Sequence, residues 1–98
     1  MSETAIFITA ELEISEQIDT TEGRKAIIQF CADMESEPGC DMAKPMAVKD
    51  NPRRFILWEK YQSPEAFEAH FNAEHTQAFI RSGVTTLVQA YETTAAEE

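Results

Sequence analysis

The segment that most constrains the fold is RRFILWEKY, residues 53–61, which is apolar on both faces of a predicted β-strand. Side chains alternate between the two faces of a strand. One face carries Phe55, Leu57, Glu59 and Tyr61, and the other carries Ile56, Trp58 and Lys60. Apolar side chains on both faces of a strand must be buried from water by other elements or by a partner on each side. This segment therefore predicts a layered fold built on a sheet.

Three more strands are predicted from their patterns. Residues 5–14 alternate strictly and place five apolar side chains on one face: Ile6, Ile8, Ala10, Leu12 and Ile14. Residues 40–49 predict a strand that carries Cys40, Met42, Met46 and Val48 on one side. Pro45 cannot donate to a ladder, so this strand lies at an edge or carries a bulge there. Residues 84–93 are rich in β-branched side chains and predict the last strand.

Two helices complete the pattern. Asp19 and Glu22 resemble a capping box that opens the first helix, which ends at the Pro-Gly pair of residues 38–39. The sequence Ser-Pro-Glu at 63–65 opens the second, which is predicted to run to about Arg81.

The resulting order, β-α-β-β-α-β, predicts a ferredoxin-like α+β domain with two helices on one face of an antiparallel sheet. Ile56 and Trp58 then lie on the face without helices. Contiguous exposed apolar surface usually marks an interface. We therefore expect a homodimer in which the two sheets pack face to face.

Length and charge limit the possible classes. A chain of 98 residues holds a single domain (residues 1–98), with its core at about 5–93. The net charge of −10 makes nucleic acids and anionic membranes poor partners. No apolar run approaches the ~20 residues of a membrane span, and a cytoplasmic protein is expected. Cys31 and Cys40 form no zinc motif; a buried free thiol is favoured for Cys31, with a redox pair as the alternative.

The two histidines of the chain, His70 and His75, lie in the second helix. Positions five apart on an unbroken helix are about 140° apart around its axis, so a shared metal ion is not expected. The predicted buried face of this helix comprises Phe67, Phe71, Ala78 and Phe79. His75 lies along this face, and His70 borders its opposite edge. A kink at Asn72 or Ala73 would change the angle between the two histidines and let them converge. Each is either a hydrogen-bonded structural residue or a general base or donor to substrate.

Glu59 is the exception on its apolar face. A carboxylate between Leu57 and Tyr61 must be paired, hydrogen-bonded or raised in pKa. It is either a salt-bridged acid at a strand end or the acid or base of a pocket.

The segments EPGC at 37–40 and RFILWEKYQSPEAFEAHFNAEHTQAF at 54–79 resemble the antibiotic biosynthesis monooxygenase family. The resemblance implies a dimeric α/β barrel with one pocket per subunit. It also implies oxidation of quinols or aromatic polyketides by oxygen with no metal or flavin, so no cofactor is expected. Glu59, His70 and His75 are the candidate catalytic residues. The candidate substrate contacts are Tyr61, Phe67, Phe71 and Phe79.

Other activities fit the sequence less well. The haem-degrading relatives carry an asparagine on the first strand and a tryptophan beside a histidine on the second helix, and this chain has neither. An isomerase acting through an enediol is an alternative, with Arg53, Arg54 and Lys60 as candidates to bind a phosphorylated substrate, although the acidic charge argues against it. A non-catalytic dimer that binds a small aromatic ligand is the other alternative.

Overall fold

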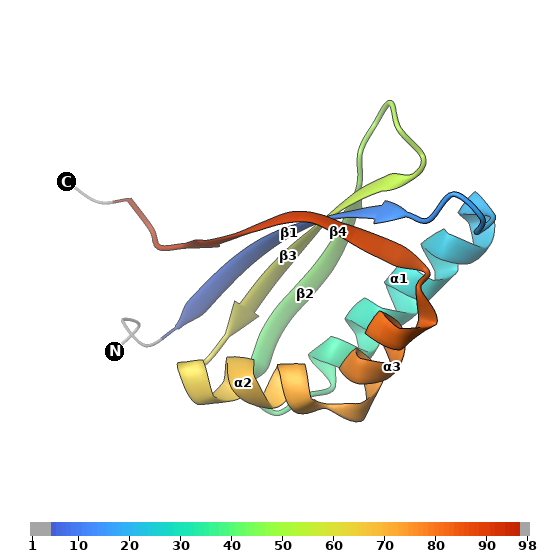
Figure 1. Cartoon of the computed structure of the whole chain (residues 1–98). Helices are drawn as coiled ribbons and strands as arrows, with labels where there is room; N and C mark the ends of the chain where they lie inside the picture. Colours follow the sequence, from blue (N-terminus) through green and yellow to red (C-terminus); the bar gives the residue numbers. More distant parts are fainter. Residues whose placement is uncertain (1–4, 97–98) are drawn as a thin grey trace.

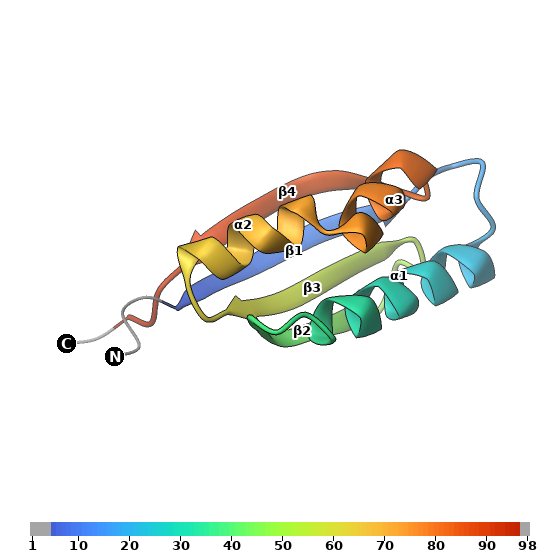
Figure 2. The same ribbon diagram turned by 90° about the horizontal axis from the view of Figure 1, so that it is seen from below.

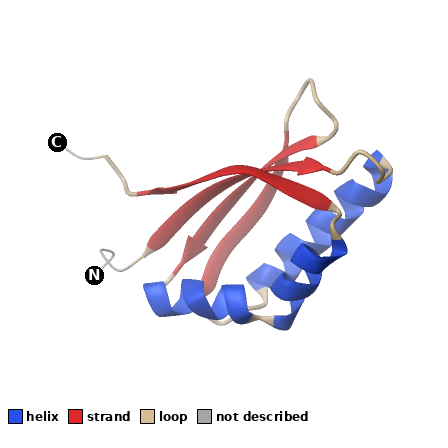
Figure 3. Ribbon diagram, viewed as in Figure 1, coloured by secondary structure: helices blue, strands red, loops and turns tan. Residues whose placement is uncertain are grey.

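A computed structural model describes residues 5–96. Over these residues the chain forms a four-stranded antiparallel sheet and three helices in the order β-α-β-β-α-α-β (Figures 1 and 3). The elements are β1 (Ile6–Ile14), α1 (Thr20–Glu35), β2 (Cys40–Ala47), β3 (Arg54–Tyr61), α2 (Pro64–Asn72), α3 (Glu74–Ser82) and β4 (Thr85–Thr93). The predicted ferredoxin-like α+β fold is confirmed.

The sheet has the strand order β2-β3-β1-β4, so the two long central strands are β1 and β3. They pair antiparallel, with Ile8 opposite Glu59 and Ala10 opposite Leu57. The helices cover one face of the sheet, seen from below in Figure 2. The core lies between them. It consists of the inward side chains of β1 and β3, Cys40 and Ala43 of β2, and Ile27, Phe30, Cys31 and Met34 of α1. The predicted alternation of β1 and β3 is therefore confirmed.

The helix starts follow the predicted caps. The Asp19 side chain accepts hydrogen bonds from the backbone N–H groups of Thr21 and Glu22. The Ser63 hydroxyl accepts one from Ala66 N–H, with Pro64 at the first position of α2. These side chains satisfy N–H groups that have no partner within the helix.

Strand β2 differs from the predicted pattern. It is an edge strand, as Pro45 indicated, but its register shifts between Cys40 and Met42 rather than at the proline. An extra residue in a strand reverses the faces of the residues after it. As a result Cys40 and Ala43 are buried, whereas Met46 is 41% exposed. The prediction that Cys40, Met42 and Met46 share one face is wrong for this reason.

The predicted single helix up to about Arg81 is also wrong, because Ala73 interrupts it. Ala73 has φ −67° and ψ 145°, an extended conformation that ends α2 and precedes α3. The Gln77 amide donates to the Phe71 carbonyl at 2.6 Å, which satisfies a carbonyl left by the break. The change of axis leaves Phe71 and Ala78 exposed, while Phe67 and Phe79 pack on the core.

Cys31 and Cys40 are both free and buried, as favoured for Cys31. Burial raises the pKa of the Cys31 thiol to about 12 and that of the Cys40 thiol to about 11.

Within residues 5–96, no helix has the length and apolar character needed to span a membrane.

Candidate active site

The break at Ala73 turns the two histidines toward one another. His70 lies in the last turn of α2, and His75 lies in the first turn of α3. The premise of an unbroken helix, which separates the two by about 140°, is therefore wrong. Their ring centroids are 6.5 Å apart. His70 is buried, whereas the His75 side chain keeps 26% of its surface exposed.

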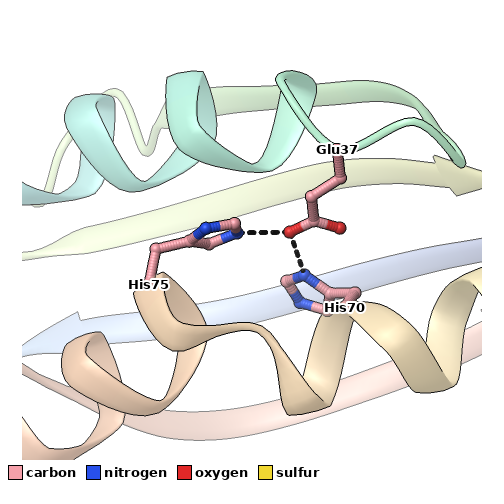
Figure 4. Close-up of side chains that lie close together, drawn as sticks. All are labelled: Glu37, His70 and His75. Carbon is pink, nitrogen blue, oxygen red and sulfur yellow. Dashed lines mark hydrogen bonds and ion pairs between the residues drawn. The ribbon is translucent and has the colours of Figure 1, made fainter.

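Glu37 connects the two histidines. It lies in the turn between α1 and β2, and its Oε2 atom is 2.9 Å from His70 Nδ1 and also in contact with His75 Nε2 (Figure 4). A neutral imidazole has one N–H to donate, so one carboxylate oxygen accepts from both rings without a protonated histidine. The Thr76 hydroxyl lies 3.3 Å from His70 Nδ1. The three elements α2, α3 and the α1–β2 turn thus meet at one polar cluster.

Aromatic rings fix the orientation of His70. Its ring centroid lies 5.2 Å from that of Tyr61, 6.1 Å from that of Phe30 and 6.4 Å from that of Phe67. Rings packed this closely leave the imidazole little rotational freedom. The rigid position of His70 is therefore set from both the sheet and α1.

Glu59 is 7% exposed and lies on the inner face of β3. The Tyr61 hydroxyl donates to Glu59 Oε1 at 2.6 Å. Burial raises the pKa of the Glu59 carboxyl to about 7; the charge of Glu37 adds to this effect and the Tyr61 hydrogen bond opposes it. Burial next to Glu59 raises the pKa of Tyr61, which therefore remains a donor. A carboxyl with this pKa can take up or release a proton near neutral pH.

A cavity of about 420 Å³ lies between the helices and the inner face of the sheet. Glu59, His70 and Thr76 supply polar groups to a wall that is otherwise mainly apolar. Its aromatic lining is Phe30, Phe67, Phe71, Phe79 and Tyr91. Phe71 and Tyr91 are about half exposed, at 48% and 55%, so the cavity has an apolar rim. A mainly apolar lining with a few polar groups is typical of small-molecule sites.

Most of the predicted site residues meet at this cavity. Glu59 and His70 line it, and so do the three predicted phenylalanines Phe67, Phe71 and Phe79. Tyr61 is fully buried and contacts Glu59 rather than the cavity. His75 contacts Glu37 outside the cavity wall.

Glu37 and Thr76 were not predicted from the sequence as site residues. Glu37 is an acid in a turn, a position that is usually solvated, and nothing near it in the sequence indicates a buried partner. Thr76 lies six residues after His70, and on an unbroken helix the two would be about 120° apart around the axis. Only the break at Ala73 brings Thr76 to 2% exposure beside His70.

The candidate phosphate-binding residues do not reach the cavity. Arg53 donates to the backbone carbonyls of Ser15 and Ile18. Arg54 forms ion pairs with Glu11 at 2.5 Å and Glu13 at 3.0 Å. The third residue, Lys60, lies 5.4 Å above the Phe7 ring on the outer face of the sheet.

The fold and the site together define a class of small α+β proteins, in which a ferredoxin-like sheet and its helices enclose an apolar pocket with a buried acid. Residues 19–82 match the antibiotic biosynthesis monooxygenase family. The chain belongs to this family.

Two relatives illustrate the similarity. The uncharacterised protein YjcS of Bacillus subtilis (strain 168) is 30% identical over 70 residues, which cover 71% of this chain and 67% of YjcS. The solved structure of YjcS superposes with a TM-score of 0.82 over 95% of this chain and all of that one, at 24% identity.

SnoaB from Streptomyces nogalater, a cofactor-independent oxygenase, superposes with a TM-score of 0.81. The match covers 97% of this chain and 96% of SnoaB at 10% identity, so this likeness concerns the fold alone.

Proposed function

We propose that this protein is a monooxygenase that oxidises a small quinol or polyphenol with molecular oxygen and without a cofactor. One observation carries the proposal: the Glu59 carboxyl lies in the wall of an aromatic-lined cavity and burial raises its pKa to about 7. A general base works best when its pKa lies near the working pH. Membership of the family supports the reaction class, and the geometry supports the choice of base.

The reaction begins with proton transfer. The Glu59 carboxylate takes the proton of a phenolic hydroxyl, and the phenolate passes one electron to O₂. The semiquinone radical and superoxide then combine at a ring carbon, and Glu59 returns its proton to the resulting peroxide. Loss of the ring C–H proton together with hydroxide breaks the O–O bond. One oxygen atom stays in the hydroxyquinone product and the other leaves as water.

The other cavity residues position the substrate. With Nδ1 donating to Glu37, the Nε2 atom of His70 is an acceptor for a second substrate hydroxyl. Phe67 and Phe79 offer ring faces to an aromatic substrate. A volume of about 420 Å³ falls in the usual range for small-molecule sites. An apolar wall also excludes water, which favours electron transfer from the phenolate over its reprotonation.

We further propose that a second copy of the chain packs on the outer face of the sheet. Trp58 is 48% exposed there, and Ile56 lies two residues before it on the same face of β3. A hollow of about 220 Å³ is lined by Trp58, Met42 and Phe7, among others. Two such faces packed together would bury these side chains and give the dimeric barrel expected from the sequence.

The test of the activity is oxygen consumption with a panel of substituted hydroquinones. We expect Glu59→Gln, which keeps the shape of the side chain but removes the base, to lower kcat about 10²–10⁴-fold. The matched control is Glu68→Gln, an exposed acid on α2. His70→Asn keeps a donor near the Nδ1 position and should raise KM more than it lowers kcat.

Equal rates for the wild type and Glu59→Gln would contradict the assigned role. Tight binding of a hydroquinone that is recovered chemically unchanged would support the non-catalytic alternative instead.

A further inference from the structure

Three ligand atoms of the type that binds transition metals converge at the junction of α2 and α3. Glu37 offers a carboxylate oxygen and His70 and His75 each offer an imidazole nitrogen, and these atoms all lie within 4.8 Å of one another. Figure 4 shows the three side chains pointing to a common centre from three segments of the chain. We propose that Glu37, His70 and His75 bind one divalent transition-metal ion of the zinc class.

The distances are close to those of a bound site. Bonds of about 2.0–2.1 Å to a tetrahedral ion place the ligand atoms roughly 3.3 Å apart. The 2.9 Å between Glu37 Oε2 and His70 Nδ1 needs to widen by only about 0.4 Å, and the widest pair needs to approach by about 1.5 Å at most. His75 supplies this movement, because its side chain is 26% exposed whereas that of His70 is 6% exposed.

The imidazole rings are also aimed correctly. Each ring directs one nitrogen at the same carboxylate oxygen. An N–H bond and the lone pair that replaces it after proton loss point in the same direction within the ring plane. Both nitrogens therefore present lone pairs to the centre of the cluster once each neutral ring carries its proton on its other nitrogen.

The surroundings hold this arrangement in place. The backbone N–H of Glu37 donates to the Met34 carbonyl at 3.0 Å, which anchors the turn to the end of α1. His70 is enclosed by aromatic rings, and the Thr76 hydroxyl lies 3.3 Å from its Nδ1 atom. Ligand groups fixed by neighbouring contacts lose little entropy on binding. The net charge of −10 adds a field that favours cations.

The donor set selects the kind of ion. Two imidazoles and a carboxylate suit zinc and ferrous iron, whereas calcium and magnesium prefer oxygen ligands alone. Three protein ligands leave a position open for water or another small ligand. Glu59 is not one of the ligands, and the oxidation assigned to it requires no metal. His70 belongs to both sites, because a metal ion on Nδ1 leaves Nε2–H as a donor to substrate. Metal binding is measured without substrate, so its failure is distinguishable from failure of the proposed oxidation.

The experiment is a Co²⁺ titration of the full chain after dialysis against a chelator. The visible d–d absorption reports nitrogen and oxygen coordination, and competition with Zn²⁺ gives the zinc affinity. We expect one ion per chain, and a loss of affinity of at least about tenfold in His75→Ala and in Glu37→Gln, each of which removes a ligand. Glu74→Gln, an exposed acid next to His75, is the matched control and should bind as the wild type does.

The proposal is wrong if Co²⁺ produces no such absorption, or if the two ligand variants bind as tightly as the wild type. In that case the cluster is a hydrogen-bonded contact only. Because His75 is partly exposed, His75→Ala should keep its far-ultraviolet circular dichroism, and it therefore separates loss of a ligand from loss of the fold. The metal-binding result needs no measurement of oxidation.

Discussion

Replacing Glu59 by glutamine should stabilise the protein, and the gain should depend on pH in a defined way. Glu59 is 7% exposed, and its pKa rises from about 4.5 to about 7 on folding, mainly through burial. Between these two values the unfolded chain has lost the proton and the folded chain has kept it. Unfolding therefore releases a proton, and the stability of the wild type falls as the pH rises.

The size of the effect follows from the two pKa values. A pKa difference of this size corresponds to about 3 kcal/mol in the free energy of unfolding of the wild type. This contribution is fully present below about pH 4.5 and fully lost above about pH 7. Glu59→Gln has no proton to lose and still accepts the hydrogen bond from Tyr61. We expect the free energy of unfolding of Glu59→Gln to equal that of the wild type near pH 4 and to be about 3 kcal/mol larger near pH 8.

The assay is urea unfolding at fixed protein concentration, at pH values from about 4 to about 8. Glu68→Gln removes the same charge from an exposed position and controls for the overall field of the acidic chain. If the free energies of unfolding of the wild type and Glu59→Gln changed with pH in parallel, the reasoning would be refuted. Such a result would mean that Glu59 has the same pKa in the folded and unfolded chains.

Three further outcomes are expected. Gly39→Ala should cost about 1–3 kcal/mol in urea unfolding, since an added Cβ would lie 2.4 Å from the Ala66 Cβ, and Ala66→Gly in the same chain should recover part of it. Cys31 and Cys40 should resist a thiol reagent at about pH 8, because burial raises their pKa values, yet react once urea unfolds the chain; rapid reaction of the native protein would argue against their burial. Trp58→Glu should convert the proposed dimer into monomers in sedimentation velocity, and an unchanged sedimentation coefficient would exclude this face as the interface.

The sequence predicted most of the fold because local and global signals agree. Alternation in β1 and β3 assigns the inner face correctly, and the caps at Asp19 and Ser63 mark the helix starts. It failed at two irregularities. The bulge in β2 is a feature of its pairing with β3, and no local pattern in the sequence marks it. The break at Ala73 replaces a stretch of helix with one extended residue, and neither proline nor glycine stands there to indicate it.

The same limit applies to the site. Glu59 stood out because a carboxylate on an apolar strand face is physically costly, and His70 followed from its place on the helix. Glu37 lies 33 residues before His70, and no local pattern connects the two. The sequence allowed a kink at Asn72 or Ala73 but gave no pattern that established it, so the spacing on an unbroken helix argued against a shared ion.

The most direct test of the proposed function is the pH dependence of kcat/KM for oxygen consumption with a hydroquinone substrate. If Glu59 is the base, kcat/KM rises with pH and levels off above an inflection near pH 7, the pKa of the buried carboxyl. Glu59→Gln should lose both the activity and this inflection. An active wild type whose inflection persists in Glu59→Gln would show that another group removes the proton, and would contradict the account.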